Sequence, residues 1–348
     1  MSDQFVEKLE VVRLLASGVA GSSVIVSDQK RRYIADYGQC RTVAKGCQIF
    51  HCDDCHRSVV VYNSCNRRGC PVCAEKNQRA WLESVKRRLI PTGHLHLEFS
   101  FPEGITERWR KNPRETIGEL FRAVNRVIKK LERQQGLRIG RMLVFQSHGK
   151  GLSYKAHVHC LMTDGGMNCD GEWEKMGVLP LAQMERWVGE SLPGSEERKG
   201  FGIHQSRYER SGVGVAVYLS QKQFGQIIKP ANLEKRTESI EVRDRSGETR
   251  LEVENFIQRY LDHVPEKGTV MVRHYGLYSN REVEWRKKAM EVLQVEEAQK
   301  EAEYEPCCPH CQTVMRLVGV WKAYEPKSFE AWGFGSHPPE HWQMGKAS

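Results

Sequence analysis

The pattern in this sequence best suited to hold a catalytic metal ion is a pair of histidines one residue apart, His157 and His159. In a β-strand, residues i and i+2 point to the same face, so both imidazoles would face one cation while Val158 points to the other side. The preceding apolar run ends in three polar residues at 146–148, and one of them could complete the site. A pair of core histidines satisfied by the backbone is the alternative interpretation.

The expected ligands also indicate the kind of metal. Two imidazoles and one oxygen leave coordination positions open, and open positions can bind the phosphate oxygens of a substrate. Such a site suits Mg²⁺ or Mn²⁺ acting as a Lewis acid, in contrast to a closed structural zinc site. His94 and His96 form a second pair on one face of an earlier strand.

Tyr218 and Lys222 are the candidate nucleophile and its activating group. They lie four residues apart and would share one face of a helix. A tyrosine whose pKa stays near 10 is a weak nucleophile, so a metal ion and a neighbouring ammonium group would supply the activation that phosphoryl transfer requires. An ordinary packing tyrosine on an amphipathic helix is the competing interpretation.

Seven of the twelve cysteines lie between Cys40 and Cys73. Four of them form two C-x2-C pairs separated by fourteen residues, Cys52 with Cys55 and Cys70 with Cys73. Two thiolate pairs on tight turns can close tetrahedrally around one Zn²⁺. We therefore predict that these four residues form a zinc site, and its task is structural because a fully coordinated zinc has no open position for substrate.

Three cysteines of the same stretch, Cys40, Cys47 and Cys65, are left over, with His56 beside them. They could form a second zinc site. Alternatively, Cys65 could replace one of the four cysteines of the first site.

A second cysteine group lies near the C-terminus, where Cys308 and Cys311 form another C-x2-C pair. His337 and His341 have H-x3-H spacing, so a weaker hypothesis places a zinc between these four residues. A knuckle turn without metal is the alternative.

Basic residues flank the predicted zinc site and continue along the helix that follows it. Arginine and lysine side chains on one face would turn this module toward the phosphates of DNA, whereas a solvated basic face is the alternative. The candidate DNA contacts here are Arg67, Arg68, Arg79, Lys86, Arg87 and Arg88.

The elements that must position these residues alternate between amphipathic helices and short strands. Apolar periodicity predicts helices at 74–90 and 113–136. Short apolar or alternating runs predict strands at 94–99, 142–147 and 157–162. We therefore expect an α+β fold in which helices cover the faces of a sheet.

Composition indicates a basic globular protein with a polyanionic partner. The 348 residues include 53 Lys and Arg against 44 Asp and Glu, a formal charge of +9, so nucleic acid is the leading partner. No apolar run approaches the roughly 18 residues of a membrane span, and the first residues are not those of a secretory signal. We expect a cytoplasmic protein, in which clustered cysteines indicate metal binding rather than disulfides.

Several motifs occur in an order that is specific as a set. They are YNSCNRRGCPVC at 62–73, HLHLEFSFP at 94–102, HVHCL at 157–161, VRHYGLYSNR at 272–281 and CPHC at 308–311. In this order they resemble the zinc-module signature, the first catalytic motif, the HUH motif and the C-terminal pattern of the insertion sequence ninety-one family of transposases. The resemblance covers about residues 38–315.

The resemblance implies an HUH ferredoxin-like fold, in which a central antiparallel sheet displays the two histidines and a helix presents the tyrosine. It implies cleavage of single-stranded DNA, with hairpins at element ends, to give a 5′-phosphotyrosine and a free 3′-hydroxyl in rolling-circle transposition, without a nucleotide cofactor. By motif position, His157, His159 and Gln146 are the metal ligands and Tyr218 is the nucleophile. Arg273 and His274 join the candidate DNA contacts, and a homodimer is an expected assembly.

Five regions are expected along the chain. The first three are an N-terminal helical arm at 1–38, a zinc-binding, DNA-contacting module at 39–82 and the HUH catalytic domain at 90–230. An accessory hairpin and helical region at 231–295 and a C-terminal segment at 296–348 complete the chain.

The chain departs from the family pattern at the tyrosine helix. Many relatives have two tyrosines four residues apart, but here Lys222 occupies the second position, which predicts a single-tyrosine enzyme and resembles the helix of replication initiators. A rolling-circle replication initiator is therefore an alternative function. A zinc-dependent DNA-binding regulator without catalysis is another.

Overall fold

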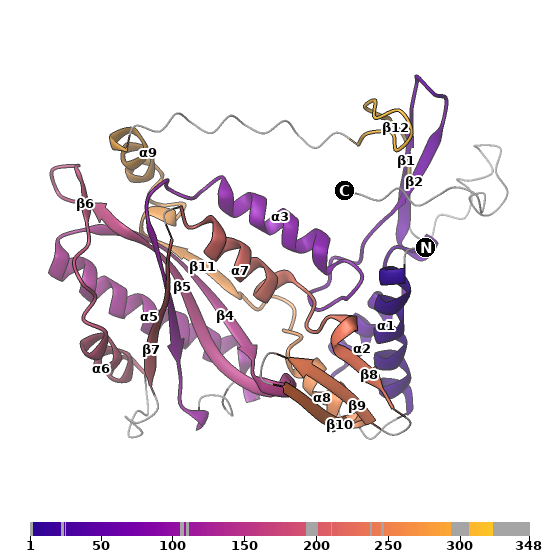
Figure 1. The fold of residues 1–348 in the computed structure, drawn as a ribbon, viewed down its shortest axis with the longest axis horizontal. Helices are drawn as coiled ribbons and strands as arrows, with labels where there is room; N and C mark the ends of the chain where they lie inside the picture. The colour runs from indigo at the N-terminus through magenta and orange to yellow at the C-terminus, as the bar shows by residue number, and fades with distance from the viewer. Residues whose placement is uncertain are drawn as a thin grey trace.

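A six-stranded antiparallel sheet lies at the centre of the computed structural model (Figure 1). Five strands follow the order β11-β4-β5-β3-β7, and β6 pairs with the last residues of β5. Their bounds are β3 (His94–Ser100), β4 (Arg138–His148), β5 (Tyr154–Met167), β6 (Trp173–Lys175), β7 (Gly202–Glu209) and β11 (Val272–Tyr275). The structure describes residues 3–21, 24, 26–104, 108, 111–192, 201–209, 211–236, 239–244, 247–293 and 306–322.

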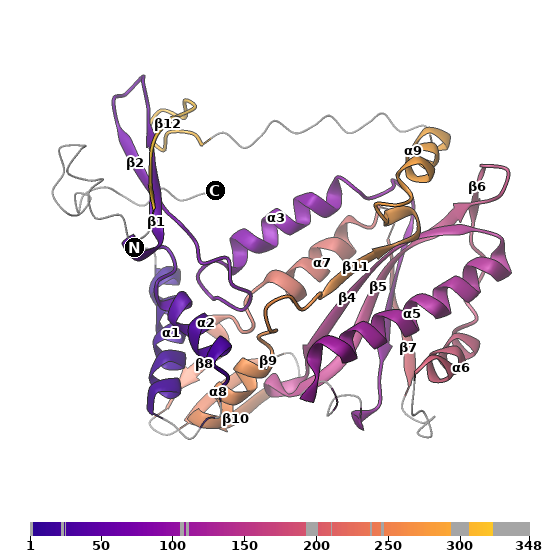
Figure 2. The same ribbon diagram turned by 180° about the vertical axis from the view of Figure 1, so that it is seen from behind.

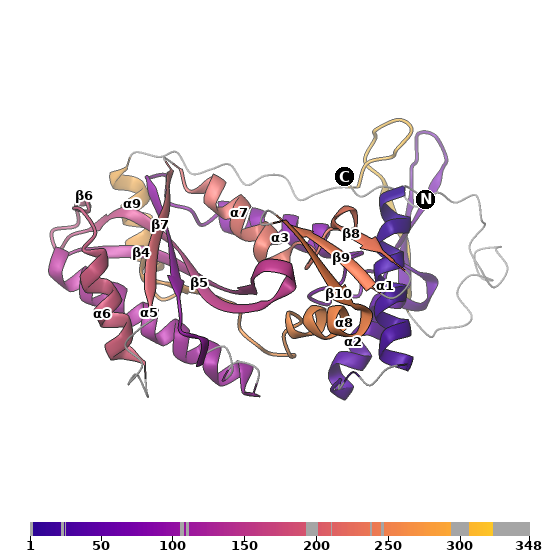
Figure 3. The same cartoon turned by 60° about the horizontal axis from the view of Figure 1, so that its bottom comes forward.

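Helices cover both faces of this sheet, as Figure 3 shows. One face carries α5 (Pro113–Gln135) and α6 (Leu181–Ser191), and the other carries α3 (Ala74–Lys86) and α7 (Val213–Phe224). Alternate residues of β4 and β5 divide between the two faces, so Phe145 and Val158 pack under α5 while Val144 packs under α7. The predicted α+β fold with a central antiparallel sheet is confirmed.

The longest of these helices, α5, begins and ends at residues that are typical of helix termini. Pro113 occupies the first turn, where its missing N–H leaves no hydrogen bond unmade. Gly136 follows in the left-handed conformation with a φ of 68°, which glycine adopts without strain. Figure 2 shows α5 lying along the sheet. Its buried side is mostly aliphatic, with Thr116 and Phe121 among the aliphatic residues. The helix therefore fixes the sheet from the side opposite to α7.

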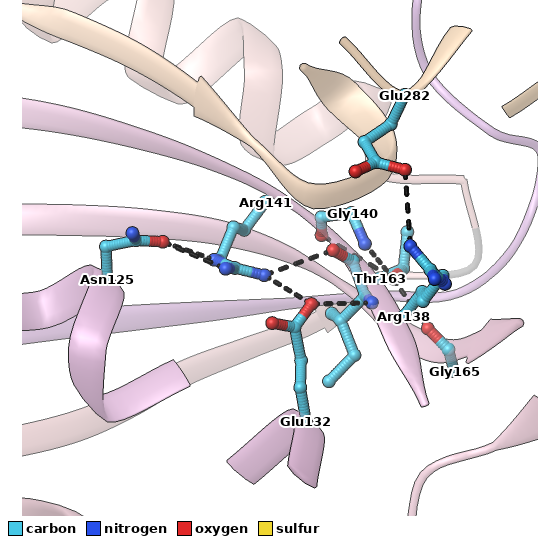
Figure 4. A network of polar contacts seen from close by, with 9 residues as sticks. Asn125, Glu132, Arg138, Gly140, Arg141, Thr163, Gly165 and Glu282 are labelled. Atoms are coloured by element: carbon cyan, nitrogen blue, oxygen red, sulfur yellow. Dashed lines mark hydrogen bonds and ion pairs between the residues drawn. The ribbon is translucent and has the colours of Figure 1, made fainter. Parts of the chain in front are cut away.

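A buried arginine fastens α5 to the central strands (Figure 4). The guanidinium of Arg141 on β4 is only 1% exposed. It donates to Glu132 at 2.6 Å and to Asn125 at 2.9 and 3.0 Å, both on α5. Because a buried charge is costly unless it is paired and hydrogen-bonded, this network fixes the position of β4 relative to α5.

A second core lies beside the sheet, on the side of the chain's N-terminus (Figure 1). It combines α1 (Asp3–Gly21), α2 (Asp28–Gly38) and α8 (Val253–Asp262) with a small antiparallel sheet of order β10-β9-β8. The strands of that sheet are β8 (Leu233–Lys235), β9 (Ser239–Asp244) and β10 (Gly247–Glu252). The expected N-terminal arm thus packs on the expected accessory region.

A three-stranded ribbon projects from the body of the molecule, as Figures 1 and 3 show. Its order is β12-β1-β2, in which β1 (Gly46–His51) pairs with both β2 (Ser58–Tyr62) and β12 (Arg316–Lys322). The ribbon therefore joins a strand from near the end of the chain to a hairpin from near its beginning.

The remaining helices are short connections. They are α9 (Val283–Val292) and the 3₁₀ turns η1 (Val43–Lys45), η2 (Lys150–Leu152), η3 (Pro230–Asn232) and η4 (Gly276–Tyr278). Among the described helices, none has the length and apolar character that crossing a membrane requires.

Candidate functional site

Three side chains from β4 and β5 converge on one point on the face covered by α7. Gln146 and His157 are directly opposite each other in the β4–β5 pairing, and His159 follows two residues along the same face. The Oε1 atom of Gln146 lies 3.0 Å from Nε2 of His157 and 2.5 Å from Nε2 of His159. All three side chains are buried. The structure thus brings together the three residues that the sequence predicts as catalytic metal ligands.

The contacts on the far side of each imidazole define where its proton lies. Nδ1 of His157 is 2.9 Å from the carbonyl oxygen of Lys155, which can only accept, so the proton sits on Nδ1 and Nε2 carries a lone pair. Nδ1 of His159 is 3.0 Å from Nε2 of His96 and 3.9 Å from a carboxylate oxygen of Glu98. When His159 donates from Nδ1, its Nε2 carries a lone pair as well.

The resulting donor set fits a divalent cation. Two imidazole nitrogens and one amide oxygen, each with a lone pair, point toward the same small volume. Burial lowers the pKa of His157 and of His159, and the positive charge of Lys222 lowers both further. Both rings therefore stay neutral near pH 7, as a metal ligand must.

Helix α7 places Tyr218 directly over these ligands. The Tyr218 ring lies 5.8 Å from the ring of His159 and 5.5 Å from the ring of His96, measured between centroids. Nζ of Lys222, one turn further along α7, is 5.6 Å from the centre of the Tyr218 ring. The predicted nucleophile and its predicted cationic neighbour are therefore next to the predicted metal ligands.

A glycine makes the close approach of α7 to the sheet feasible. Gly212, immediately before α7, has a φ of 67°, and a Cβ atom there would lie 2.6 Å from the ring of His94. Any larger residue would be strained in this conformation and would push the start of α7 away from β3. The position of Tyr218 depends on this contact.

A small cavity opens beside Gln146, and basic side chains line it. Its walls include Arg68, His148 and Lys222. Within the part of the chain that the structure describes, neither ring nitrogen of His148 has a hydrogen-bond partner. Burial holds the pKa of His148 well below its usual value, so the ring is neutral. A guanidinium, an ammonium group and an imidazole N–H donor around one cavity form a suitable environment for a phosphate oxygen.

Eight cysteines form two groups of four, which differ from the grouping predicted from spacing. The inner group is Cys40, Cys65, Cys70 and Cys73, and the outer group is Cys52, Cys55, Cys308 and Cys311. In each group all four Sγ atoms lie within 4.8 Å of one another. Each group therefore offers a complete set of thiolate ligands for one Zn²⁺.

The prediction that Cys52 and Cys55 share a site with Cys70 and Cys73 is wrong, and the β1–β2 hairpin explains why. The first pair lies at the tip of the hairpin, and the second lies beyond its base, after Tyr62. A strand rises about 3.3 Å per residue, so the five residues of β2 separate the two pairs by roughly 17 Å.

The structure also revises the expectations for the leftover residues. Cys65 belongs to the inner group, with its Sγ atom 3.7 Å from that of Cys73, while Cys47 packs in the core of the ribbon. Neither Cys47 nor His56 belongs to either group. His337 and His341 lie outside the described residues, and Cys308 and Cys311 face other cysteines instead.

The inner group is built into the second core. Tyr37 of α2 and Tyr260 of α8 donate to the carbonyl oxygens of Arg68 and Gly69, at 2.6 and 2.7 Å, in the loop between its cysteines. Cys73 is the residue that precedes α3. The group therefore fixes the loop on one side and the start of α3 on the other.

Helix α3 in turn packs along the tyrosine helix. Gln78 of α3 donates to the hydroxyl of Ser220 at 3.2 Å, and the ring of Trp81 lies 5.1 Å from that of Phe224. The guanidinium of Arg68 also lies over the ring of Phe224, 4.8 Å from its centroid. The inner group, α3 and α7 thus form one packed unit that ends at Tyr218.

The predicted DNA contacts occupy different environments. Arg67 pairs with Asp36 at 2.7 Å, and burial lowers the pKa of Arg68 to about 10, which leaves it charged at neutral pH. His274 is partly buried beside Arg88, and burial lowers its pKa to about 4. Exposed side chains among the predicted contacts are Arg79, Lys86, Arg87 and Arg273.

Two residues near the metal ligands had no predicted role. His96 and Glu98 face His159 across the β3–β5 pairing. The signal in the sequence was the period of two in the run from His94, which puts His96 and Glu98 on one face of β3. That pattern predicts that His96 and Glu98 share a face of β3, but it does not predict that β5 lies next to β3.

Comparisons with known proteins agree with this arrangement. A family described as “Transposase zinc-binding domain” matches residues 19–101, and one described as “Putative transposase” matches residues 140–192 and 182–287. No solved structure matches the chain.

Two relatives share substantial stretches of sequence with the chain. A “Putative transposase” of Sinorhizobium fredii is 30% identical over 171 residues, 48% of this chain and 43% of the relative. The “Transposase for insertion sequence element IS801” of Pseudomonas savastanoi pv. phaseolicola is 24% identical over 281 residues, 70% of this chain and 68% of the relative. The chain thus spans less than half the length of the first relative.

Proposed function

Because the chain belongs to the insertion sequence ninety-one family of transposases and has a zinc-binding domain near its N-terminus, we propose that it nicks and rejoins single-stranded DNA through Tyr218. The observation that carries this proposal is the position of the Tyr218 ring, 5.8 Å from the ring of His159 and over a triad of metal-ligand side chains. A tyrosine that only packs in the core would have no reason to lie beside three potential metal ligands.

The proposed reaction is a transesterification at one phosphodiester. The hydroxyl oxygen of Tyr218 forms a bond to phosphorus while the bond from phosphorus to the 3′-oxygen breaks. The phenolic proton ends on the departing 3′-oxygen, so the products are a 5′-phosphotyrosine and a free 3′-hydroxyl. The covalent link retains the phosphodiester energy, and attack by a 3′-hydroxyl reverses the step without a nucleotide cofactor.

Gln146, His157 and His159 would hold a Mg²⁺ or Mn²⁺ ion, which supplies Lewis-acid polarisation of the scissile phosphate when bound. The side chains around them have separate tasks. Lys222 stabilises negative charge near the phenol oxygen and the phosphate, and His96 and Glu98 orient His159 by accepting from its Nδ1 side.

Single-stranded DNA would approach along α3 and the cavity beside Gln146. The basic lining of that cavity by Arg68 and Lys222 lies next to the ligand triad, where a phosphate adjoining the scissile one would sit. Exposed Arg79 and Lys86 of α3, together with Arg87 just after it, add further positive charge along this helix. We also propose that the protein recognises DNA hairpins at the ends of the element.

A single tyrosine constrains the order of the strand-transfer steps. Lys222 stands one helical turn after Tyr218, so α7 offers one phenol only. The second transesterification must therefore use the tyrosine of a second copy of the chain, or Tyr218 again after a 3′-hydroxyl has released it. We propose the first of these routes, in which the chain acts as a homodimer and each copy supplies one tyrosine.

The decisive experiment incubates the protein with labelled single-stranded DNA carrying an end of the element, together with Mn²⁺. Tyr218→Phe should abolish the denaturant-resistant adduct and leave DNA binding nearly unchanged, since it removes one hydroxyl. Tyr275→Phe, in a half-buried tyrosine on β11, is the matched control and should retain the adduct. His157→Ala should reduce cleavage, with partial recovery at excess Mn²⁺ because Gln146 and His159 remain.

The same experiment separates the rival functions. An adduct formed by the Tyr218→Phe protein would refute the assignment of the nucleophile. A wild-type protein that binds DNA and never forms an adduct would be a DNA-binding regulator. A replication initiator shares the chemistry, and nicking of a double-stranded plasmid origin in place of element ends would identify it.

A further inference from the structure

The outer cysteine group joins segments that lie 253 residues apart in the sequence. The Sγ atoms of Cys55 and Cys308 are 3.5 Å apart, and those of Cys52 and Cys311 are 3.4 Å apart. In a tetrahedral site with zinc–sulfur bonds of about 2.3 Å, neighbouring sulfurs lie roughly 3.8 Å apart. The observed spacings are close to that value, and the pairing of β1 with β12 holds the two turns in this arrangement.

The two turns that carry these cysteines have the same backbone shape. The amide of Cys52 donates to the carbonyl of Arg57, and the amide of Cys308 donates to the carbonyl of Thr313, both at 2.8 Å and both five residues onward. The residue after each second cysteine is left-handed, with a φ of 54° at His56 and 64° at Gln312. Two copies of one strained turn, facing each other, indicate paired metal-binding knuckles.

Apolar burial around the outer group itself is small, although β12 also pairs with β1 along the ribbon. Among the described residues, the buried members of its core besides cysteines are Val59 and Met315, with Phe50 and Val61 half-buried against them. On β12, Leu317 and Val320 are 48% and 55% exposed. The Arg316–Asp53 ion pair between the knuckles is also exposed and therefore weak. Small units with so little core are usually held by metal or disulfide links.

We propose that Cys52, Cys55, Cys308 and Cys311 bind one Zn²⁺ that closes the beginning of the chain on its end. This ion is separate from the one in the inner group, and it makes β12 a permanent third strand of the ribbon. The C-terminal C-x2-C pair then completes a site of which the N-terminal module supplies half. The proposal is independent of the DNA chemistry, since it concerns only the zinc content and the chain ends.

The direct test is to measure the zinc content per chain of the purified full-length protein by elemental analysis. The wild type should hold two ions, and Cys52→Ser/Cys55→Ser and Cys308→Ser/Cys311→Ser should each hold one. The variant with all four changes should also hold one, because the two pairs share the same ion. Cys307→Ser, in an exposed neighbour outside the group, is the matched control and should hold two.

A quadruple variant without zinc would mean that the pairs serve different ions and would overturn the proposal. So would either double variant that keeps two ions, or a wild type with only one. If the variants do not fold, alkylation of the wild-type protein still tests the proposal.

In the zinc-loaded protein Cys311, although exposed, should resist alkylation while Cys169 and Cys307 react. Removal of zinc by a chelator should make Cys311 and Cys55 reactive together. Rapid alkylation of Cys311 with zinc present would contradict the proposal.

A protease site inserted between residues 293 and 306 provides a second readout on the wild-type ligands. After cleavage, the C-terminal fragment should remain bound through size-exclusion chromatography and separate when a chelator is added. Retention of the fragment in the Cys52→Ser/Cys55→Ser protein would show that something other than the shared ion holds it, and release from the zinc-loaded wild type would contradict the shared site.

Discussion

The inner and outer cysteine groups each offer four thiols to a metal ion, but in opposite surroundings. The inner group spans Cys40 to Cys73 and lies within a core built by three helices and a small sheet. The outer group joins distant parts of the chain in a thin, largely exposed ribbon. We infer from this difference that the same ligand chemistry serves two mechanical purposes. The inner group would brace the tyrosine helix, and the outer group would close the chain.

The largest expected effect comes from removing one ligand of each group in turn. Cys70→Ser should abolish most of the soluble, folded protein, because the binding free energy of a structural zinc is on the order of 10 kcal/mol, similar to the stability of a whole domain. Cys308→Ser should leave the body folded and release only β12. Soluble yield, circular dichroism and zinc content measure the difference.

Cys169→Ser, in an exposed cysteine outside both groups, is the control and should behave as the wild type. Equal losses of folded protein in the Cys70→Ser and Cys308→Ser proteins would remove the distinction between a bracing group and a closing group.

Acid should destabilise the central sheet beneath α7 without any mutation of a cysteine in either group. Burial lowers the pKa of His94, beneath the start of α7, to about 4. Between pH 6.5 and 4 the unfolded chain takes up a proton that folded His94 excludes, so the free energy of unfolding falls as the pH drops. At pH 5 this loss is about 2 kcal/mol for His94.

Urea unfolding at pH 7.5 and pH 5, followed by tryptophan fluorescence, measures this loss. His94→Gln keeps a neutral polar side chain and should reduce the dependence on pH. A wild type whose unfolding free energy rises on acidification would contradict the buried, neutral state of His94.

The smallest effect should come from the contact between the inner group's helix and the tyrosine helix. Trp81→Ala removes the packing of α3 against Phe224 and should slow adduct formation roughly tenfold, on the order of 1 kcal/mol, with zinc content unchanged. Glu83→Ala, on the same helix and paired only with surface Lys86, is the control. An unchanged rate in the Trp81→Ala protein would mean that the inner group stabilises the fold without bracing Tyr218.

Sequence reasoning reached the sheet and its helices because their signals are local. The alternating run at 94–99 and the amphipathic stretch at 113–136 lie within β3 and α5 almost to the residue. The shared face of His157 and His159 followed from the period of two, and the meeting with Tyr218 followed from the family resemblance. Their catalytic roles stay predictions.

The grouping of the cysteines could not be reached in the same way. Spacing identified the C-x2-C pairs but not their partners, because the contact of Cys55 with Cys308 spans 253 residues and no local pattern encodes it. One local signal was overlooked. The β-branched run at 58–62 between the two N-terminal pairs reads as a strand, and a strand of that length is too long to let Cys55 and Cys70 share an ion.

The separation of the outer ligands has a consequence for biosynthesis. At about 5 to 20 residues per second, the ribosome needs roughly 13 to 50 seconds to add the 253 residues between Cys55 and Cys308. The inner group can load its ion while the central sheet is still being translated, whereas the thiols at the tip of the hairpin must wait for almost the whole chain. During that interval they are open to cellular thiols, to stray metals and to chaperones, so the yield of correctly metallated protein should depend on how fast translation proceeds.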